Sequence, residues 1–349
     1  MVSTEKKAGF RFLIAGPEHT EIIKKMYESI SYDGPIDIQF RRGDDPYHSV
    51  VSESDDHVIL LCRSERDGKY IAMGICSIYK AYLDGEIKRV GYLNGLKILP
   101  EYRKKMTILP RGFAALHEVL DGRVDLCFAS MLRSAAENQK MFEKRRSFMP
   151  AYVRQCEYTS YLFRPARRDG IGLCHGFSEK LNEFYKLNAP KYNLRPVHPV
   201  SEITDNDWLY WEKDGRIAAA CAVFDETENK NYYLNRYNGV MRTLSHFPTK
   251  LIGLPAFPKE HSIADTVTMS MLLFDDSLDL PERRRFILSA SSYARDHNIC
   301  ILGLTDSGDT YKVFRSIPNV PFGSYLYTID WGRDSDITGR RVFCDTALM

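Results

Sequence analysis

Apolar positions in the first half of the chain switch between helical and strand spacing. Residues 17–30 carry apolar side chains at three- and four-residue intervals, which predicts a helix with one buried face. Residues 57–63 and 70–78 are apolar segments joined by Asp67-Gly68, a pair typical of tight hairpin turns. The pattern then predicts a strand over 88–99, a helix over 110–120, and strands over 124–132 and 152–163.

The second half repeats this order of elements. A predicted helix over 177–185 precedes strands at 208–212 and 216–224, which are joined by Asp214-Gly215. The two hairpins also match in sequence, since D-G-K-Y-I-A and D-G-R-I-A-A stand at corresponding places. This favours an internal duplication of one α/β unit, with chance similarity of two common turns as the alternative. The remaining predicted elements are a strand over 266–274, a helix over 280–297, a strand over 300–304, a short helix at 310–315 and a strand over 322–331.

A break in the pattern separates the two halves. Residues 164–170 read R-P-A-R-R-D-G and interrupt the apolar periodicity with proline, glycine and charge. At 349 residues the chain is long enough for two domains that each bury a core. We therefore expect one domain over 1–165 and another over 170–349.

Charge limits the classes of function. The 48 Lys and Arg residues exceed the 46 Asp and Glu residues by only two, which argues against a general nucleic-acid or membrane-binding protein. The total hides two halves of opposite sign, since residues 1–168 hold 28 basic and 22 acidic side chains and residues 169–349 hold 20 and 24. A nucleic-acid-binding factor built on the positive half would also need a basic face with aromatic platforms, which the sequence does not locate.

Eight cysteines stand singly along the chain, with no C-x-x-C pair and no histidine at zinc-ligand spacing. Several lie in apolar stretches, so we interpret them as reduced core thiols and expect no metal site and a cytoplasmic protein. The charged amino terminus is followed by an apolar run, residues 12–15, that is too short for a signal sequence or a membrane span.

The junction after residue 98 carries the most informative chemistry. A long strand ends in Pro100-Glu101-Tyr102-Arg103 and runs towards a helix start. Free backbone amides and basic side chains at such a junction favour binding of a phosphate group. An ordinary strand-to-helix connection with solvated basic residues is the alternative.

Residues 96–109 resemble the acetyl-CoA loop of the GNAT N-acetyltransferase superfamily, in which a strand ending in a Val-x-Pro-Glu-Tyr-Arg type sequence leads into R-x-x-G-x-G/A and a helix. The resemblance covers most of residues 10–165 in element order and residues 170–331 more faintly. It implies an α/β protein of two GNAT-like domains in tandem, each a mostly antiparallel, twisted mixed sheet flanked by helices. The first domain would bind acyl-CoA, most simply acetyl-CoA, and the second would be a degenerate copy.

The resemblance also assigns roles to single residues. Met106 and Ile108 stand where the family has small residues, so their side chains must point away from a bound phosphate. Phe142 stands where many members have a tyrosine, and a phenyl ring cannot protonate a departing thiolate. The strand end would face the pantetheine arm and the loop would line the pyrophosphate through Leu96, Ile98, Leu99, Arg103, Lys104, Lys105, Met106, Thr107 and Ile108.

The proposed reaction also needs a group that accepts a proton from the attacking amine. Asp84 and Glu86 are the carboxylate candidates near the central strand, with solvated turn residues as the alternative interpretation, and Asn94 could orient the acyl group or a water. In the second half, Asp275, Asp276 and Asp279 stand where a phosphate would need cations, which argues against a cofactor there.

Two functions follow from these features. The first is an acyl-CoA-dependent acyltransferase that transfers an acetyl group to a primary amine of a small molecule or peptide. The alternative is a non-catalytic GNAT-like module that binds acyl-CoA or serves as a scaffold, which Phe142 and the missing loop glycines favour. The identity of the acceptor and the oligomeric state cannot be read from the sequence.

Overall fold

The computed structural model describes residues 9–29, 36–103, 107–144, 146, 148–200, 202–332, 337 and 340–348. The first half contains β1 (Phe10–Ile14), α1 (Thr20–Glu28), β2 (Ile36–Arg42), α2 (Pro46–Val51), β3 (Asp56–Ser64), β4 (Tyr70–Leu83), β5 (Glu86–Ile98), α3 (Ile108–Leu120), β6 (Leu126–Leu132), α4 (Ala136–Glu143) and β7 (Ala151–Phe163). The second half contains β8 (Cys174–His175), α5 (Glu179–Asn188), β9 (Tyr192–Asn193), β10 (Arg195–Pro196), β11 (Trp208–Lys213), β12 (Arg216–Phe224), β13 (Lys230–Tyr237), α6 (Val240–Leu244), β14 (Ser262–Ile263), β15 (Thr266–Phe274), α7 (Leu280–Ser291), β16 (Ile299–Thr305), β17 (Asn319–Asp330) and β18 (Arg341–Val342). Short 3-10 turns are η1 (Pro17–His19), η2 (Pro100–Tyr102), η3 (Ala189–Lys191), η4 (Asp205–Asp207), η5 (Thr249–Ile252), η6 (Ser292–Ala294), η7 (Thr310–Arg315) and η8 (Thr346–Leu348).

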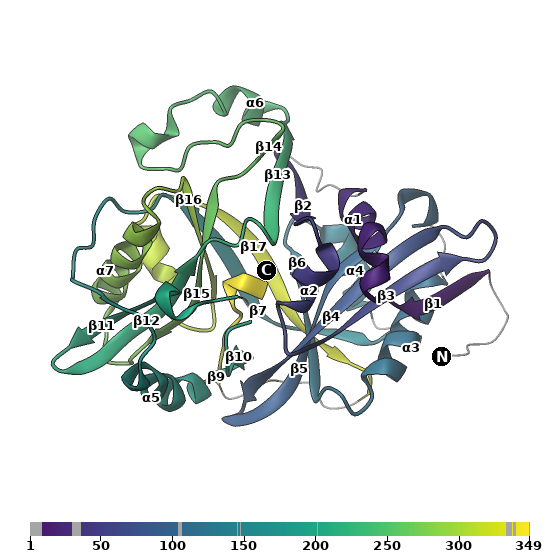
Figure 1. The fold of residues 1–349 in the computed structure, drawn as a ribbon, viewed down its shortest axis with the longest axis horizontal. Helices are drawn as coiled ribbons and strands as arrows, with labels where there is room; N and C mark the ends of the chain where they lie inside the picture. The colour runs from purple at the N-terminus through teal and green to yellow at the C-terminus, as the bar shows by residue number, and fades with distance from the viewer. Residues whose placement is uncertain are drawn as a thin grey trace.

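One large mixed sheet runs through the molecule in the order β1-β3-β4-β5-β6-β17-β7-β16-β15-β12-β11-β8 (Figure 1). Its neighbours are antiparallel except at β5–β6 and β15–β16, which are parallel. Both halves therefore present the same sequence of pairings, a hairpin, then an antiparallel strand, then a parallel partner. The predicted fold class, a mostly antiparallel mixed sheet flanked by helices, is confirmed.

The last strands of the two halves are exchanged. β7 does not pair with β6, as a self-contained first half would require, but lies between β17 and β16. β17 takes the vacant place beside β6, with Tyr327 opposite Ala129. The large sheet therefore continues across the predicted boundary at residues 165–170, and each half is completed by a strand from the other.

A second, three-stranded sheet also joins the halves. β2 pairs with β13 along seven positions, and β14 covers the other edge of β13. These strands were not among those predicted, nor were α2 and α6. β2 and β13 are rich in polar and charged residues, and several of these are buried in pairs such as Arg42–Glu53 at 2.8 Å. The hydrophobic pattern therefore gave no sign of them.

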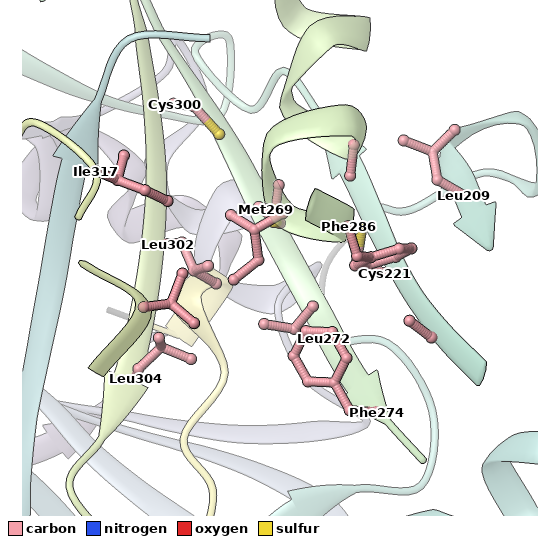
Figure 2. Packing of buried hydrophobic residues seen from close by; sticks show 14 of the residues in the cluster. Leu209, Cys221, Met269, Leu272, Phe274, Phe286, Cys300, Leu302, Leu304 and Ile317 are labelled. Atoms are coloured by element: carbon pink, nitrogen blue, oxygen red, sulfur yellow. The ribbon is translucent and has the colours of Figure 1, made fainter. Parts of the chain in front are cut away.

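The helices cover opposite faces of the sheet. α1 packs on Ile59 and Met73, whereas α3 packs on the alternate residues Val58 and Cys76, so the two helices lie on opposite faces of β3–β4. In the second half, Phe286 of α7 enters a cluster formed by β12, β15 and β16 (Figure 2). The carboxyl-terminal residues reach the middle of the molecule, between these two packed halves (Figure 1).

All eight cysteines lie in the described part of the chain, where they form no disulfide and seven are buried. Burial raises the pKa of the Cys62 thiol to about 12, which is typical of a core thiol rather than a nucleophile. No three His, Cys, Asp or Glu side chains of the described residues gather as metal ligands would. None of the described helices combines the length and apolar character needed to cross a membrane.

Candidate functional site

The two parallel strands of the first half diverge after a short contact. β5 pairs with β6 from Val90 to Leu93, and β6 then continues in contact with β17 on its other edge. Residues 94–98 of β5 have no strand partner on this side among the described residues. We call the gap between residues 94–98 of β5 and 130–132 of β6 the first notch. It exposes a strand edge that an extended ligand can pair with.

A β-bulge shapes the edge of the first notch. Asn94 pairs with Ile75 and Lys97 pairs with Met73, so two residues of β5 oppose one of β4. Gly95, the first of these two, has φ +60°, and a Cβ there would lie 2.7 Å from Ile75 Cδ1. The bulge therefore depends on glycine at this position.

Beyond the bulge, backbone polar groups of β5 point into the first notch. The amide of Leu99 donates to Ile71 O of β4, so by strand alternation the amide and carbonyl of Ile98 point away from β4 and into the notch. Arg103 folds back from the following turn, and its Nε donates to Ile98 O at 3.2 Å. A guanidinium thus stands at the end of the exposed edge.

The second half contains the corresponding second notch, between residues 270–274 of β15 and 303–305 of β16. These strands pair in parallel only from Thr266 to Met269, and β15 then carries a bulge at Met271–Leu272. Met271 has φ +54°, a left-handed conformation that is rare for this residue type. The two bulges therefore match in place and in backbone conformation, which supports the predicted duplication.

The chain's own residues fill the second notch. The amide of Met271 donates to Asp345 Oδ2 at 2.8 Å, and the Ser270 hydroxyl donates to Asp345 Oδ1 at 2.5 Å. Next to it, the amide of Gly303 donates to Thr346 Oγ1 at 2.9 Å. The bulge amide of the second half is thus bound to an anionic oxygen. No described side chain takes the place of Asp345 in the first notch.

The strained Met271 backbone is also held from its other side. Arg195, which is fully buried, donates from Nη2 to Met271 O and from Nη1 to Leu272 O, both at 2.8 Å. The Tyr185 hydroxyl donates to Met271 O as well. These bonds fix a conformation that would otherwise relax.

Polar side chains line one face of the first notch. The Asn94 amide donates to Ser77 Oγ at 3.1 Å, and the Tyr92 hydroxyl lies 2.8 Å from Ser130 Oγ. The Tyr27 hydroxyl reaches the bulge from α1, 3.3 Å from where a Gly95 Cβ would lie, and is buried without a hydrogen-bond partner among the described residues. Burial raises the pKa of Tyr27, against the opposing effect of Arg42.

Lys97 follows the bulge on the same face. It is 4% exposed, and its Nζ lies 5.6 Å from the centre of the Tyr27 ring. Burial, with a smaller contribution from the charge of Arg103, lowers the pKa of Lys97 to about 8. A group with that pKa is partly neutral near neutral pH and can accept a proton.

The predicted loop residues lie at one end of this notch. Leu96 is the second bulge residue and is 47% exposed, and Leu99 ends the strand edge. Thr107 precedes α3, and Ile108 is buried in the core with its side chain away from the loop, as the resemblance requires. Lys104, Lys105 and Met106 lie outside the described residues.

The predicted carboxylates are not brought to the notch. Glu86 is the first residue of β5 and Asp84 lies in the turn before it, so they stand nine and eleven residues before Gly95, which is roughly 30 Å along an extended strand. Asp84 is engaged with Asn193 at 3.2 Å, and Glu86 pairs with Lys88 at 2.7 Å. β5 is 13 residues long, and its two ends lie far apart. The hairpin turn that carries the two carboxylates is at one end, and the first notch is at the other.

Sequence reasoning missed Lys97 and the hydroxyl of Tyr27. A signal for Lys97 was present, since it is a single charge within the apolar run Leu96-Lys97-Ile98-Leu99. Phe142 is buried among aromatic rings, with Tyr152 at 4.6 Å between ring centres. No proton donor therefore stands where the family tyrosine was expected.

Comparisons with known proteins agree with this fold. No family model and no curated protein matches the sequence. Among solved structures, Saccharomyces cerevisiae N-myristoyltransferase with bound myristoyl-CoA matches with a TM-score of 0.60 and 11% identity, over 96% of this chain and 88% of that one. The same enzyme with myristoyl-CoA and inhibitors matches with a TM-score of 0.58 and 11% identity, over 97% and 86%. A GCN5-related N-acetyltransferase from Anabaena variabilis matches with a TM-score of 0.49 and 9% identity, over 91% and 72%. The chain therefore shares the fold of the N-myristoyltransferase structures, and identities this low concern the fold alone.

Proposed function

We propose that this protein is an acyl-CoA-dependent N-acyltransferase that transfers an acyl group, acetyl in the simplest case, to a primary amine of a small molecule or peptide. The observation that carries the proposal is the contrast between the two notches. In the second notch, the bulge amide holds a carboxylate oxygen from the chain itself. In the first notch, no described side chain stands where Asp345 stands in the second, and we assign the corresponding Gly95 amide to the thioester carbonyl of a bound acyl-CoA.

The backbone of the first notch supports this placement. The pantetheine arm, which carries amide groups, would pair with the edge around Ile98, and the pyrophosphate would lie between Arg103 and the start of α3. Negative charge that develops on the carbonyl oxygen during attack would be stabilised by the Gly95 amide, fixed beforehand by the bulge. We keep the acyl-CoA site in domain 1–165 and treat domain 170–349 as the degenerate copy.

Lys97 and Tyr27 supply the proton transfers in this proposal. The attacking amine forms the new N–C bond and gives its proton to neutral Lys97 Nζ, while the C–S bond breaks. The thiolate that leaves takes a proton from the buried hydroxyl of Tyr27, since Phe142 cannot provide one. Both groups flank the same bulge, on the face opposite α3.

Ligand binding and turnover test the proposal together. Acetyl-CoA at a hundred times its Kd should raise the free energy of unfolding by about 2.7 kcal/mol, because it binds only the folded state. A panel of primary amines should then release the CoA thiol. Stabilisation without thiol release from any amine would favour a non-catalytic module that binds acyl-CoA. No stabilisation would exclude both the enzyme and the acyl-CoA-binding module and would leave only the scaffold.

Arg103 is expected to contribute to CoA affinity. Replacing it by alanine should weaken CoA binding by about 1–3 kcal/mol, the range of a charge-assisted hydrogen bond, as measured by calorimetry. The exposed side chain of Arg103 contributes little to stability, so folding should be unchanged. The matched control is Arg285→Ala, which removes an exposed guanidinium from α7 in the other half. Equal affinity of wild type and the Arg103→Ala, Lys104→Ala, Lys105→Ala variant would remove this loop from the site.

Lys97 is expected to make the reaction depend on pH. Its neutral form accepts the proton, so the rate should rise with pH and level off above about 8. Lys97→Met should lower kcat by roughly 10²-fold and abolish this rise. A pH–rate profile that is the same in the variant would contradict the role of Lys97.

The same substitution should stabilise the protein. The lowering of the pKa of Lys97 from 10.5 to about 8 corresponds to about 3 kcal/mol of unfolding free energy. Between pH 8 and 10.5 the unfolded chain binds more protons than the folded one, so wild-type stability rises over this range. Lys97→Met should therefore exceed wild type by up to about 3 kcal/mol at pH 7 in urea unfolding, and the difference should vanish near pH 10.5.

A further inference from the structure

Large apolar side chains are exposed together in residues 239–263, the excursion between β13 and β15. This segment holds six of the thirteen large apolar side chains that are strongly exposed in the described part of the chain. Leu251 is 81% exposed and Val240 is 76% exposed. The six are Val240, Leu244, Phe247, Leu251, Ile252 and Ile263. Clustering of this kind marks an interaction surface.

The excursion is anchored on its inner side, so its exposed side chains do not result from a loose chain end. The Tyr237 hydroxyl donates to Pro258 O at 2.9 Å, and the Thr249 hydroxyl donates to Pro255 O at 2.6 Å. Asn298 bonds both the amide and the carbonyl of Ala256, at 3.0 and 2.7 Å. α6 and η5 consequently stand beyond the end of β13, away from the large sheet (Figure 1).

Charge on and beside this surface is positive. Residues 239–263 include the cations Arg242, Lys250 and Lys259 and one acid, Glu260, whose Oε1 accepts from the amide of Tyr237 at 2.8 Å. Lys250 also borders a hollow lined by Arg164, Arg167 and Arg295, and Arg164 Nη1 donates to Lys250 O at 3.4 Å. The net charge of the whole chain, only +2, does not reveal this local excess of cations.

The acids of the hollow are partly engaged by their neighbours. Asp265 binds the His297 ring at 2.8 Å and the amide of Asn298 at 2.8 Å, which leaves Asp296 as the other carboxylate lining the hollow. The four cations of the hollow therefore outnumber its two acids. Such a site suits a phosphate group.

We propose that residues 239–263 form a membrane-docking surface for anionic lipid bilayers, with the apolar side chains in the headgroup region and the basic hollow on lipid phosphates. Apolar side chains flanked by an excess of cations are the pattern of interfacial membrane binding. A second copy of this chain fits less well, because a two-fold interface would set the same cations against each other. This inference is independent of the proposed acyltransferase activity.

Vesicle sedimentation of the full chain tests the proposal. Binding to vesicles of phosphatidylcholine with 30% phosphatidylserine should exceed binding to pure phosphatidylcholine by at least about tenfold and fall with added salt. The triple variant Phe247→Ser, Leu251→Ser, Ile252→Ser should lose binding to both, and Arg164→Ala with Lys250→Ala should lose the preference for phosphatidylserine. Leu187→Ser, which removes a 73% exposed apolar side chain from α5, is the control and should bind like wild type.

Thermal unfolding would first verify that each variant is folded, as expected for exposed positions. No sedimentation of the wild type, or equal sedimentation of wild type and triple variant, would overturn the proposal. A dimer in light scattering that the triple variant abolishes would assign the surface to a second copy instead, and would equally overturn it.

Discussion

Replacing Gly95 by alanine is expected to lower kcat by about 10²–10³-fold, the usual loss when one donor to a developing oxyanion is removed. The backbone at Gly95 has φ +60°, and an added Cβ would meet Ile75 Cδ1 at 2.7 Å and the Tyr27 hydroxyl at 3.3 Å. Ile75 can rotate only into packed core, so the bulge must shift and its amide loses its direction. Steady-state release of CoA with a substrate amine measures the effect, while CoA affinity should change far less.

Gly122→Ala is the matched control for this prediction. Gly122 has φ +67°, follows α3, and has open space around its Cβ position. Gly122→Ala should lose about 1 kcal/mol of unfolding free energy from the left-handed backbone, and Gly95→Ala should lose more because of its contact with Ile75. Only Gly95→Ala should lose activity. If the two variants lost activity equally, the bulge amide would have no catalytic role.

Local signals in the sequence predicted most of the elements. Asp67-Gly68 and Asp214-Gly215 form the two hairpins, and in each the glycine has positive φ, as the turn requires. α3 buries Phe113, Leu116 and Leu120 as its spacing indicates. These elements depend on side chains within a few residues of one another, which is the range that periodicity reports.

Long-range pairing could not be predicted in the same way. β7 and β17 are both apolar strands of similar length, and either would satisfy the edge of β6. Which of the two strands pairs with β6 depends on how each packs against neighbours from both halves of the chain. A local sequence pattern carries no information about that packing. The β2–β13 sheet was missed for a related reason, since its buried charges, such as Arg42 and Glu53, appear as surface residues in a sequence.

The candidate site was predicted in part. The strand edge at Ile98 and the side chain of Arg103 meet, and Ile108 is turned into the core, in line with the resemblance. The proposed base was sought among carboxylates, which are unprotonated at neutral pH, but burial can lower the pKa of a lysine until it too is partly unprotonated there. The single charge of Lys97 within an apolar run was visible in the sequence, but its burial and lowered pKa are properties of the folded chain.

The two notches constrain how the duplicated halves can divide their roles. Both bulges have a residue with positive φ, but only the first half has a glycine there. Met271 keeps this conformation because Asp345, Arg195 and Tyr185 bind its amide and carbonyl. The second notch is thus stable while it is filled, whereas the first keeps its shape without a bound group.

Asp345→Ala is accordingly expected to lower the free energy of unfolding by about 3–5 kcal/mol, as measured in urea. The buried carboxylate accepts bonds from the Ser270 hydroxyl and from the amides of Met271 and Ala347, and all three donors would be left without it. Asp345→Asn, which keeps one acceptor oxygen, should lose less. Asp309→Ala is the control, because it removes an exposed carboxylate that pairs with Lys312, and it should leave the free energy of unfolding nearly unchanged.

Opening the second notch should not create a second CoA site. The helix start that follows it is already capped, since Asp279 accepts from the amide of Glu282 at 2.8 Å. A hydrogen bond with Ser277 keeps the pKa of Asp275 below its usual value, and one with Lys191 does the same for Asp276. Both carboxylates therefore stay charged where the pyrophosphate would lie. Calorimetry on Asp345→Asn should therefore find one CoA per chain, as in the wild type. Two per chain would mean that the Asp345 carboxylate alone closes the second half, and that the carboxylates beside it do not determine where CoA binds.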